Sequence, residues 1–321
     1  MVDYIEVEDF ELECIGEQDV DVYDIEVEDN HNFFGNNFLL HNSNYIHLKP
    51  FVNDYVKKTG KGFDNDEDTC KFLIRVSDKV IQPAIEGAII ELTARTNCFK
   101  NTLKMDREKI MKKMILIEKK KYICHVKDDE GILLTEPKLA VTGFEIVRTS
   151  TPQVVRDKLK GTVNFILDDT TTEDSLRAFI SSYKKEWMEL TVEEISNPKG
   201  VSDVVKYEVG HDKGTFAKGC PIHVRSAIMY NYMRKKFSLQ SKYPAIHNGE
   251  KIKYTYLKKG NPLRQNIIGY PQGYNLPEEF GLHKFVDYNM QFEKTYMSPV
   301  IKLANTIGWD IMGKKKVIDL F

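Results

Sequence analysis

His41, Asn42 and Ser43 are the first residues of the chain whose types and spacing could do chemistry together. An Asn amide nitrogen can attack its own backbone carbonyl, form a succinimide and cut the chain after itself, and a neighbouring imidazole assists the proton transfers. A hydroxyl at Ser43 can accept an acyl group as an ester. The tripeptide alone is a weak signal, because most such triplets are plain loop residues.

The segment before this tripeptide must position it. Apolar residues alternate with carboxylates between residues 20 and 27, and a second apolar run extends from Phe33 to Leu40 around Gly35, Asn36 and Asn37. Alternation of this kind, interrupted by turn residues, predicts a small β unit.

Residues 22–33 and 37–43 resemble the two closing motifs of inteins, in order and at normal spacing. The resemblance implies a horseshoe-like β fold in which Asn42 cyclises with help from His41, and Ser43 is the downstream acyl acceptor. It also implies that Asp24 and His31 tune the earlier acyl shifts, without a cofactor. The alternative for these last two residues is a satisfied polar pair in a small β domain. A complete intein needs a Cys or Ser at its own first residue, yet this sequence starts with Met1 only 41 residues before Asn42. We therefore expect the C-terminal half of a split intein, whose other half lies on a partner chain.

From Ser43 on, the sequence Ser-Asn-Tyr-Ile resembles the residues just after the aspartates of the Asp-Thr-Asp-Ser palm motif in family B DNA polymerases. The resemblance to replicative polymerases of myovirus-type phages continues through the chain, in segments 105–108, 119–122, 136–138, 143–145, 149–152, 220–225, 230–231, 260–262 and 292–294. It implies a DNA-directed DNA polymerase, active only after splicing, that uses dNTPs, primer-template DNA and two Mg²⁺ ions. The ions would be held mainly by the partner fragment.

Lys119, Lys120, Lys121 and Tyr122 precede a segment with strand character. Alternate side chains of a strand project to opposite faces, so a basic, aromatic edge could lie along a duplex and neutralise phosphates without reading bases. The family commonly has Arg where Lys121 stands. The alternative is a solvated charge run, since residues 104–121 are rich in lysine.

Three further residues are candidate DNA contacts. His223 and Arg225 are expected on one face of an extended segment, where they could bind phosphate, although a core histidine is a close alternative. Arg148 precedes a Thr-Ser-Thr-Pro helix start and could place a phosphate near free backbone amides. Ordinary helix capping by the hydroxyls is equally compatible with that sequence.

The chain ends in three lysines followed by apolar Val317, Ile318, Leu320 and Phe321. This pattern could dock into a hydrophobic pocket with an acidic rim, and the polymerase resemblance implies that the pocket belongs to a ring-shaped sliding clamp. The alternative is a frayed tail that folds back on the body.

Charge is divided unevenly along the chain. Of the 48 acidic residues, 13 lie in residues 1–42 together with no Lys or Arg, which leaves 35 acidic against 46 basic residues in the remainder. This asymmetry predicts a basic protein partner for the first segment and a polyanion for the second. A non-enzymatic DNA-binding or clamp-associated module with an acidic N-terminal interaction domain remains the rival interpretation.

Composition excludes other classes of protein. No stretch reaches the roughly 18 apolar residues of a membrane span, and no secretory signal precedes the acidic segment. The five cysteines are widely spaced, which favours reduced thiols over a zinc site or disulfides. We expect a cytoplasmic protein of a phage-infected bacterial cell.

The sequence thus predicts an α+β chain with four parts. These are an intein segment (1–42), a palm edge (43–120), a mixed, mainly helical thumb (121–312) and a clamp-binding tail (313–321). Apolar spacing predicts helices over 66–97 with a bend at Pro83, and over 152–167, 172–190 and 226–237. It also predicts a hairpin about Asp128-Asp129-Glu130-Gly131 and a loop-rich stretch over 197–219.

Overall fold

The computed structural model describes the backbone of residues 32–35 and 38–41, and residues 45–96, 99–101, 103–118, 120–209 and 214–312 in full. The chain forms two compact units: unit 1 contains residues 1–110 and 127–136, and unit 2 contains residues 111–126 and 137–321. The expected boundary after residue 120 falls between two strands of one sheet, and the four-part division stays a prediction. The mixture of helices and strands agrees with the α+β class.

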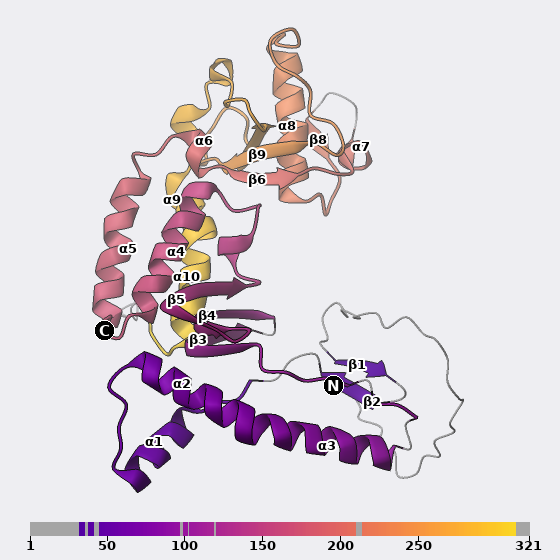
Figure 1. The fold of residues 1–321 in the computed structure, drawn as a ribbon. Coiled ribbons are helices and arrows are strands. Elements are labelled where there is room, and N and C mark those ends of the chain that lie inside the picture. Colours follow the sequence, from indigo (N-terminus) through magenta and orange to yellow (C-terminus); the bar gives the residue numbers. More distant parts are fainter. Residues whose placement is uncertain are drawn as a thin grey trace, which may run out of the picture. The chain divides into compact units, whose positions relative to one another are not determined.

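The described part of unit 1 opens with a hairpin and continues with helices (Figure 1). Strands β1 (Asn32–Gly35) and β2 (Phe38–His41) pair antiparallel and place Asn32 opposite His41, as the second apolar run predicted. Helix α1 (Lys49–Thr59) follows, and its Tyr55 ring packs on Phe72 of α2 (Asp66–Val76) with ring centroids 4.5 Å apart.

The helix expected over 66–97 is continuous but not regular. A π-helical turn, Ser77–Ile81, joins α2 to α3 (Gln82–Arg95). Pro83 lies in the first turn of α3, where it lacks an amide hydrogen and its ring crowds the carbonyl four residues earlier. A widened turn at this point relieves that crowding, so the irregularity occurs where the bend was predicted.

A three-stranded sheet follows with the order β3 (Lys109–Glu118), β4 (Lys121–Asp129) and β5 (Ile132–Thr142). The turn between β4 and β5 consists of Glu130 with φ 51° and Gly131 with φ 88°. Two successive positive φ angles are typical of a type I′ hairpin turn, and the hairpin predicted from the Asp-Asp-Glu-Gly sequence is confirmed.

The helical layer of unit 2 contains α4 (Gln153–Leu167), α5 (Glu173–Trp187), α9 (Tyr288–Phe292) and α10 (Ser298–Thr306). A π turn, Glu293–Met297, connects the last two. Four rings form the centre of their core: Tyr183 and Trp187 of α5 pack against Phe292 and Tyr296. The helices predicted over 152–167 and 172–190 are confirmed, but α4 has Pro152 at its N-cap and no side-chain cap.

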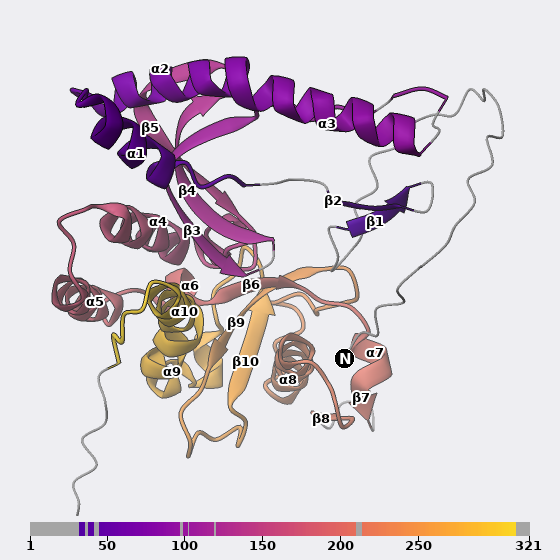
Figure 2. The ribbon, with the colours of Figure 1, turned by 90° about the horizontal axis from the view of Figure 1, so that it is seen from below.

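The rest of unit 2 is a second sheet with a helix on it (Figure 2). Strands β6 (Asn197–Gly200), β9 (Lys251–Tyr256) and β10 (Ile267–Pro271) pair antiparallel in the order β10-β9-β6. Helix α8 (Ile222–Lys236) packs against β10, where a Cβ on Gly269 would lie 2.7 Å from Ser226 Oγ. The stretch expected to be loop-rich contains β6 and further short elements: α7 (Val204–Tyr207), β7 (Glu208–Val209) and β8 (Thr215–Phe216). The four-residue helix α6 (Val192–Ile195) precedes it.

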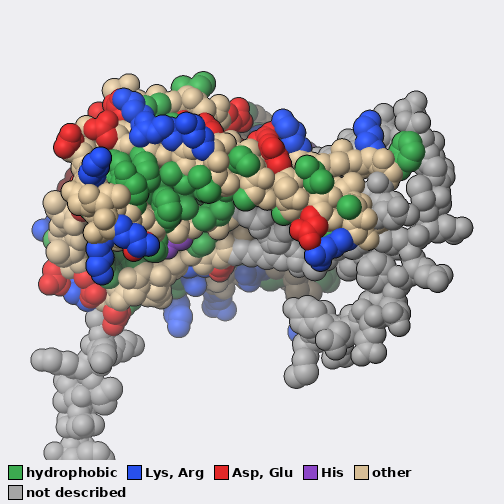
Figure 3. All heavy atoms as spheres, turned by 60° about the horizontal axis from the view of Figure 1, so that its bottom comes forward, with side chains coloured by type: hydrophobic (Ala, Val, Ile, Leu, Met, Phe, Trp, Pro, Cys, Tyr) green, Lys and Arg blue, Asp and Glu red, His purple; other side chains and the backbone are tan. Residues whose placement is uncertain are grey.

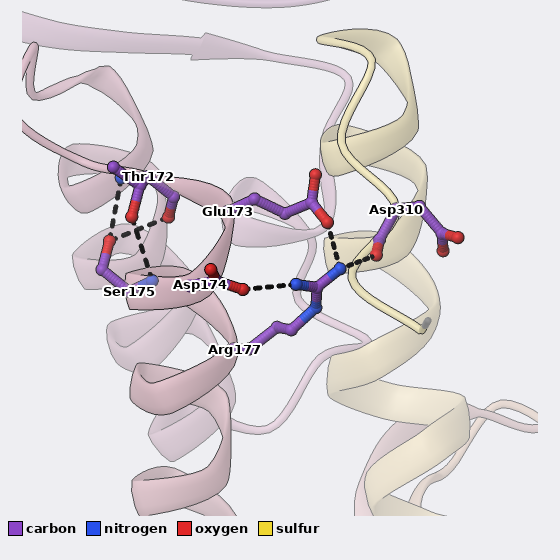
Figure 4. Close-up of polar contacts among 6 residues, drawn as sticks. All are labelled: Thr172, Glu173, Asp174, Ser175, Arg177 and Asp310. Carbon is purple, nitrogen blue, oxygen red and sulfur yellow. Dashed lines mark hydrogen bonds and ion pairs between the residues drawn. The ribbon is translucent and has the colours of Figure 1, made fainter. Parts of the chain in front are cut away.

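Helix α5 begins with a capping box and holds the end of the described chain (Figure 4). Thr172 and Ser175 exchange side-chain to backbone hydrogen bonds that cap the helix. Arg177 Nη1 contacts Asp174 Oδ1 at 2.5 Å, and Arg177 Nη2 pairs with Glu173 and donates to the Asp310 carbonyl oxygen at 2.6 Å. The segment that leads to the C-terminus is therefore fastened to α5 two residues before the description ends.

The sequence predicted reduced thiols and no membrane-spanning segment. Cys70, Cys124 and Cys220 are buried free thiols, and burial raises the pKa of Cys70 to about 11. Within the described ranges, none of the helices has the length and apolar character needed to cross a membrane.

Candidate nucleic-acid interface

The lysine run lies at a hairpin turn rather than wholly on a strand. Strand β3 ends at Glu118 and β4 begins at Lys121, so Lys120 lies in the turn with a left-handed φ of 62°. Only Lys121 and Tyr122 lie on the strand and obey the alternation expected for all four residues. Lys119 falls outside the described residues. A turn presents its side chains in more directions than a strand edge, which suits contact with a curved phosphate backbone.

Glu118 holds two lysines next to this turn. Lys121 Nζ lies 2.6 Å from one carboxylate oxygen of Glu118, and Lys302 of α10 pairs with the other. Hydrogen bonds from Lys121 and Lys302 lower the pKa of the Glu118 carboxyl to about 2. Glu118 is therefore ionised near neutral pH. It offsets part of the positive charge that the lysine run would otherwise present to a polyanion.

Gly143 and Arg148 support the turn from beneath. A Cβ at Gly143 would collide with the Lys120 carbonyl oxygen and lie 2.9 Å from Lys121 Cγ, and Gly143 has φ +65°. Only glycine permits this backbone conformation so close to the turn. Arg148 Nη2 donates to the Gly143 carbonyl oxygen at 3.2 Å, and its Nη1 lies 3.6 Å from Glu145. Arg148 therefore lies beside the lysine turn, and its guanidinium faces this glycine and Glu145.

A polar hollow with lysines and aspartates in equal number, which the sequence interpretation missed, lies on the same sheet. Its volume is about 170 Å³, and it is lined by Lys112 and Lys113 of β3, His125 of β4, and Pro137, Asn164, Leu167, Asp168 and Asp169. Lys113 Nζ pairs with Asp169 at 2.5 Å, and His125 Nε2 lies 3.3 Å from Asn164 Oδ1. The lysine-rich composition of 104–121 was the only signal for it, because Asn164 lies on α4 and Asp168 and Asp169 directly follow that helix, far along the chain.

The expectation for His223 and Arg225 was wrong in its geometry. Both lie in the first turns of helix α8, where residues two apart do not share a face. Burial, and then Lys199, lower the pKa of the His223 imidazole below its usual 6.5, which favours the neutral ring. The Arg225 guanidinium lies 5.6 Å from the Phe216 ring centroid. The structure thus groups Lys120, Lys121 and Arg148 but places these two on a separate element, and their contact with phosphate stays a prediction.

Arg107 and Asp128 form a buried ion pair in unit 1 that no sequence motif indicated. Asp128 is fully buried, Arg107 is 17% exposed, and Arg107 Nη1 contacts Asp128 Oδ1. Gly131 N donates to the same carboxylate at 3.3 Å, and Asp78 of the π turn lies 3.9 Å from Arg107 Nε. The pair therefore fastens the segment before β3 to the type I′ turn and to the helix bend.

The described residues do not supply a metal centre. Nowhere in 45–96, 99–101, 103–118, 120–209 and 214–312 do three or more His, Cys, Asp or Glu side chains come together in a way that could hold an ion. Among the splicing candidates, His41 ends strand β2, whereas Asp24, His31, Asn42 and Ser43 lie outside the described residues. The same holds for the tail residues Val317, Ile318, Leu320 and Phe321.

Comparison with known proteins identifies the class. Residues 35–306 match the DNA polymerase family B, and the chain belongs to that family. It is 28% identical over 281 residues to the DNA-directed DNA polymerase of Enterobacteria phage T4, covering 84% of this chain and 30% of that protein. It is also 28% identical over 278 residues to the DNA-directed DNA polymerase of Escherichia phage RB69, covering 83% of this chain and 30% of that protein. The chain thus spans about a third of the length of these relatives.

Proposed function

We propose that this chain is the C-terminal part of a DNA-directed DNA polymerase, where it grips the primer-template duplex. The observation that carries the proposal is the family B match over residues 35–306, which includes the lysine turn and the elements beneath it. Phosphate contacts from lysines supply affinity without reading the base sequence, which is what a replicative enzyme needs.

The part that performs nucleotide addition lies on a partner fragment in this proposal. Family B polymerases use divalent metal ions, and two Mg²⁺ ions held by aspartates of the partner would supply the charge stabilisation for phosphoryl transfer. The described residues of this chain fit no such site. Its contribution is to hold DNA in register with that site, and the isolated chain is inactive.

The two fragments are joined by protein splicing in trans. Residues 1–42 act as the C-terminal intein half: Asn42 cyclises with His41 as proton carrier, Ser43 carries the acyl group, and Asp24 and His31 assist the earlier shifts. The intein motifs and the β1–β2 hairpin that ends at His41 support this assignment. Splicing requires no cofactor, and it takes place in the cytoplasm of the infected bacterium.

Mixing this chain with the chain that carries the upstream palm motifs tests the function directly. We expect a ligated product of the summed polymerase masses and primer extension with dNTPs and Mg²⁺, whereas neither chain extends a primer alone. If the same genome already encodes a complete polymerase and the mixture adds no synthesis, the chain is instead a non-enzymatic DNA-binding module.

Replacing Lys119, Lys120 and Lys121 with alanine should weaken binding of the spliced enzyme to primer-template equally for all sequences. Each lysine that contacts a phosphate releases a counterion, so the slope of log K against log salt should flatten by about 1 per contact and by about 3 at most. Because Glu118 neutralises part of Lys121, the change Glu118→Gln should act in the opposite direction. Fluorescence anisotropy from about 50 to 200 mM salt measures both effects.

The matched control is Lys259→Ala, which removes one charge from an exposed turn after β9. We expect it to leave the slope unchanged. Loss of affinity that depends on base sequence, or an unchanged slope in the triple variant, would identify the run as merely solvated. Tyr122→Phe tests whether the neighbouring hydroxyl contributes.

Deleting Val317 to Phe321 should spare synthesis on short templates and abolish stimulation by a sliding clamp on long ones. A tether raises the effective concentration of enzyme at the primer end, so its loss affects processivity rather than chemistry. Primer extension on short and long templates with and without the clamp measures this. The deletion leaves the bond from Arg177 to Asp310 in place, so the fold of unit 2 should not change. Full stimulation of the truncated enzyme would show that the tail is not the attachment point.

A further inference from the structure

The described part of unit 1 has almost no fully buried apolar side chains, although the rings of Phe51, Tyr55, Phe63 and Phe72 pack on one another. Among the described residues, 42 apolar side chains are buried, and Cys70 is the only one of them that belongs to unit 1. By contrast, 10 of the 19 exposed large hydrophobic side chains belong to this smaller unit. A segment that folds by itself buries its large apolar residues. This distribution therefore indicates that another polypeptide segment covers the exposed apolar side chains of unit 1.

The exposed side chains follow the helices. Helices α1 and α3 bury none of their residues, although α3 contains Ile85, Ile89, Ile90 and Leu92. Figure 3 shows hydrophobic side chains gathered over α1 and α2 and further ones along α3. We call six of them, which lie on these helices or next to their ends, the apolar surface: Ile46 (60%), Phe51 (44%), Val80 (61%), Ile90 (65%), Leu92 (40%) and Phe99 (66%). A 14-residue helix in water is stabilised mainly by packing of its apolar face, and on α3 that packing stops at half-burial of residues such as Ile85 and Ile89.

We infer that the apolar surface of α1–α3 is where the upstream polymerase chain docks, and that this contact joins the two fragments without covalent linkage before splicing. The inference rests on the proposed function. The family match begins at residue 35, so all three helices belong to the polymerase and not to the preceding segment. The relatives are single proteins of which this chain matches only 30%, which leaves ample polymerase sequence to cover the surface.

The other possible occupants fit less well. Unit 2 contains the remaining buried apolar residues and so already has a complete core. Residues 1–42 carry 13 carboxylates, which are poorly suited to cover isoleucine and phenylalanine. A second copy of this chain would present the same exposed face of unit 1, so a homodimer could cover that face only by pairing it with itself.

The experiment mixes the full 321-residue chain with an upstream chain from which the intein segment has been removed, so that the intein halves cannot hold the pair together. We expect a complex by analytical ultracentrifugation. Introducing a carboxylate into the centre of such an interface should weaken it strongly, so Ile90→Glu should raise the Kd about ten-fold or more. Val80→Glu should raise the Kd in the same way, which shows that the effect does not come from a local folding defect at Ile90.

The matched control is Val205→Glu, the same change at an equally exposed aliphatic side chain on α7 of unit 2 (72% exposed, against 65% for Ile90). It should leave the Kd unchanged. Because both positions are exposed in the isolated chain, each variant should keep the wild-type circular dichroism spectrum and melting curve.

Four results would overturn the inference. They are no complex with the truncated partner, a complex that Ile90→Glu and Val80→Glu leave intact, self-association of the chain that Ile90→Glu abolishes, and strong hydrogen-exchange protection of residues 82–95 in the chain alone. The first of these, obtained while the intact pair still splices and extends primers, would remove the docking site and leave the proposed function standing. Failure of the intact pair to splice or to synthesise DNA would instead reject the proposed function.

Discussion

Replacing Asn42 with alanine should abolish release of the intein and trap a branched product. The Asn42 amide nitrogen is the nucleophile that cuts the chain before Ser43, and alanine has no equivalent. The earlier acyl transfers do not need that amide, so the upstream polymerase segment should remain attached to the Ser43 hydroxyl as an ester. On a denaturing gel the ligated polymerase should fall to background and a slower, branched species should accumulate that mild alkali resolves into its two chains.

Ser43→Ala should stop the reaction one step earlier. Without a hydroxyl there is no acceptor for the acyl group, so no branched species should form. The two chains should either keep their masses or each be cut by hydrolysis at its own junction with the intein half. The control is Asn53→Ala, at an exposed position of α1, which should splice like the wild type. Normal ligated polymerase from either Asn42→Ala or Ser43→Ala would contradict the splicing assignment.

Asp128→Asn should destabilise unit 1 by about 3–5 kcal/mol, because breaking a buried ion pair leaves the partner charge without compensation. The Arg107 side chain is 17% exposed, and its remaining carboxylate neighbour, Asp78, is 3.9 Å away and 60% exposed. A change of this size corresponds to a shift of the unfolding midpoint by about 1–5 M urea for a typical small domain.

The two units can be followed separately. Both tryptophans, Trp187 and Trp309, lie in unit 2, so their fluorescence reports that unit, whereas far-ultraviolet circular dichroism also includes helices α1–α3. We expect an early helical transition to move to lower urea while the tryptophan transition stays in place. The control Asp129→Asn makes the same change at the next residue, which is 30% exposed and 3.7 Å from Lys109. Adding Arg107→Met to Asp128→Asn should restore part of the loss, and equal shifts for both single variants would contradict the argument.

Local signals predicted much of the fold. The Asp-Asp-Glu-Gly turn was predictable because a two-residue link with glycine in second place selects one turn geometry. The bend before Pro83 was predictable because proline disturbs the preceding turn wherever it occurs. These features depend on a few neighbouring residues, and tertiary contacts had no reason to override them.

The errors have an equally physical origin. The pattern around His223 shows no clear helical period, because α8 packs against β10, β9, β8 and α7 and its buried residues 226–230 run consecutively around the helix. The alternation expected for Lys119 to Tyr122 missed the turn at Lys120, since the glycine that makes room for that turn is Gly143, more than twenty residues away. The Arg107–Asp128 pair is likewise a contact between distant segments. Neither residue has a sequence neighbour that marks it as buried.

The exposed apolar surface of α1–α3 should also affect the lifetime of the newly made chain in the cell. A protein that displays isoleucine and phenylalanine to water is a substrate for chaperones and proteases until something covers them. An unmatched surplus of this fragment should therefore be short-lived or aggregated, and its abundance should follow that of its partner rather than its own rate of synthesis. Two separately made fragments would in this way be kept near equal numbers by degradation of the excess, with no dedicated regulator.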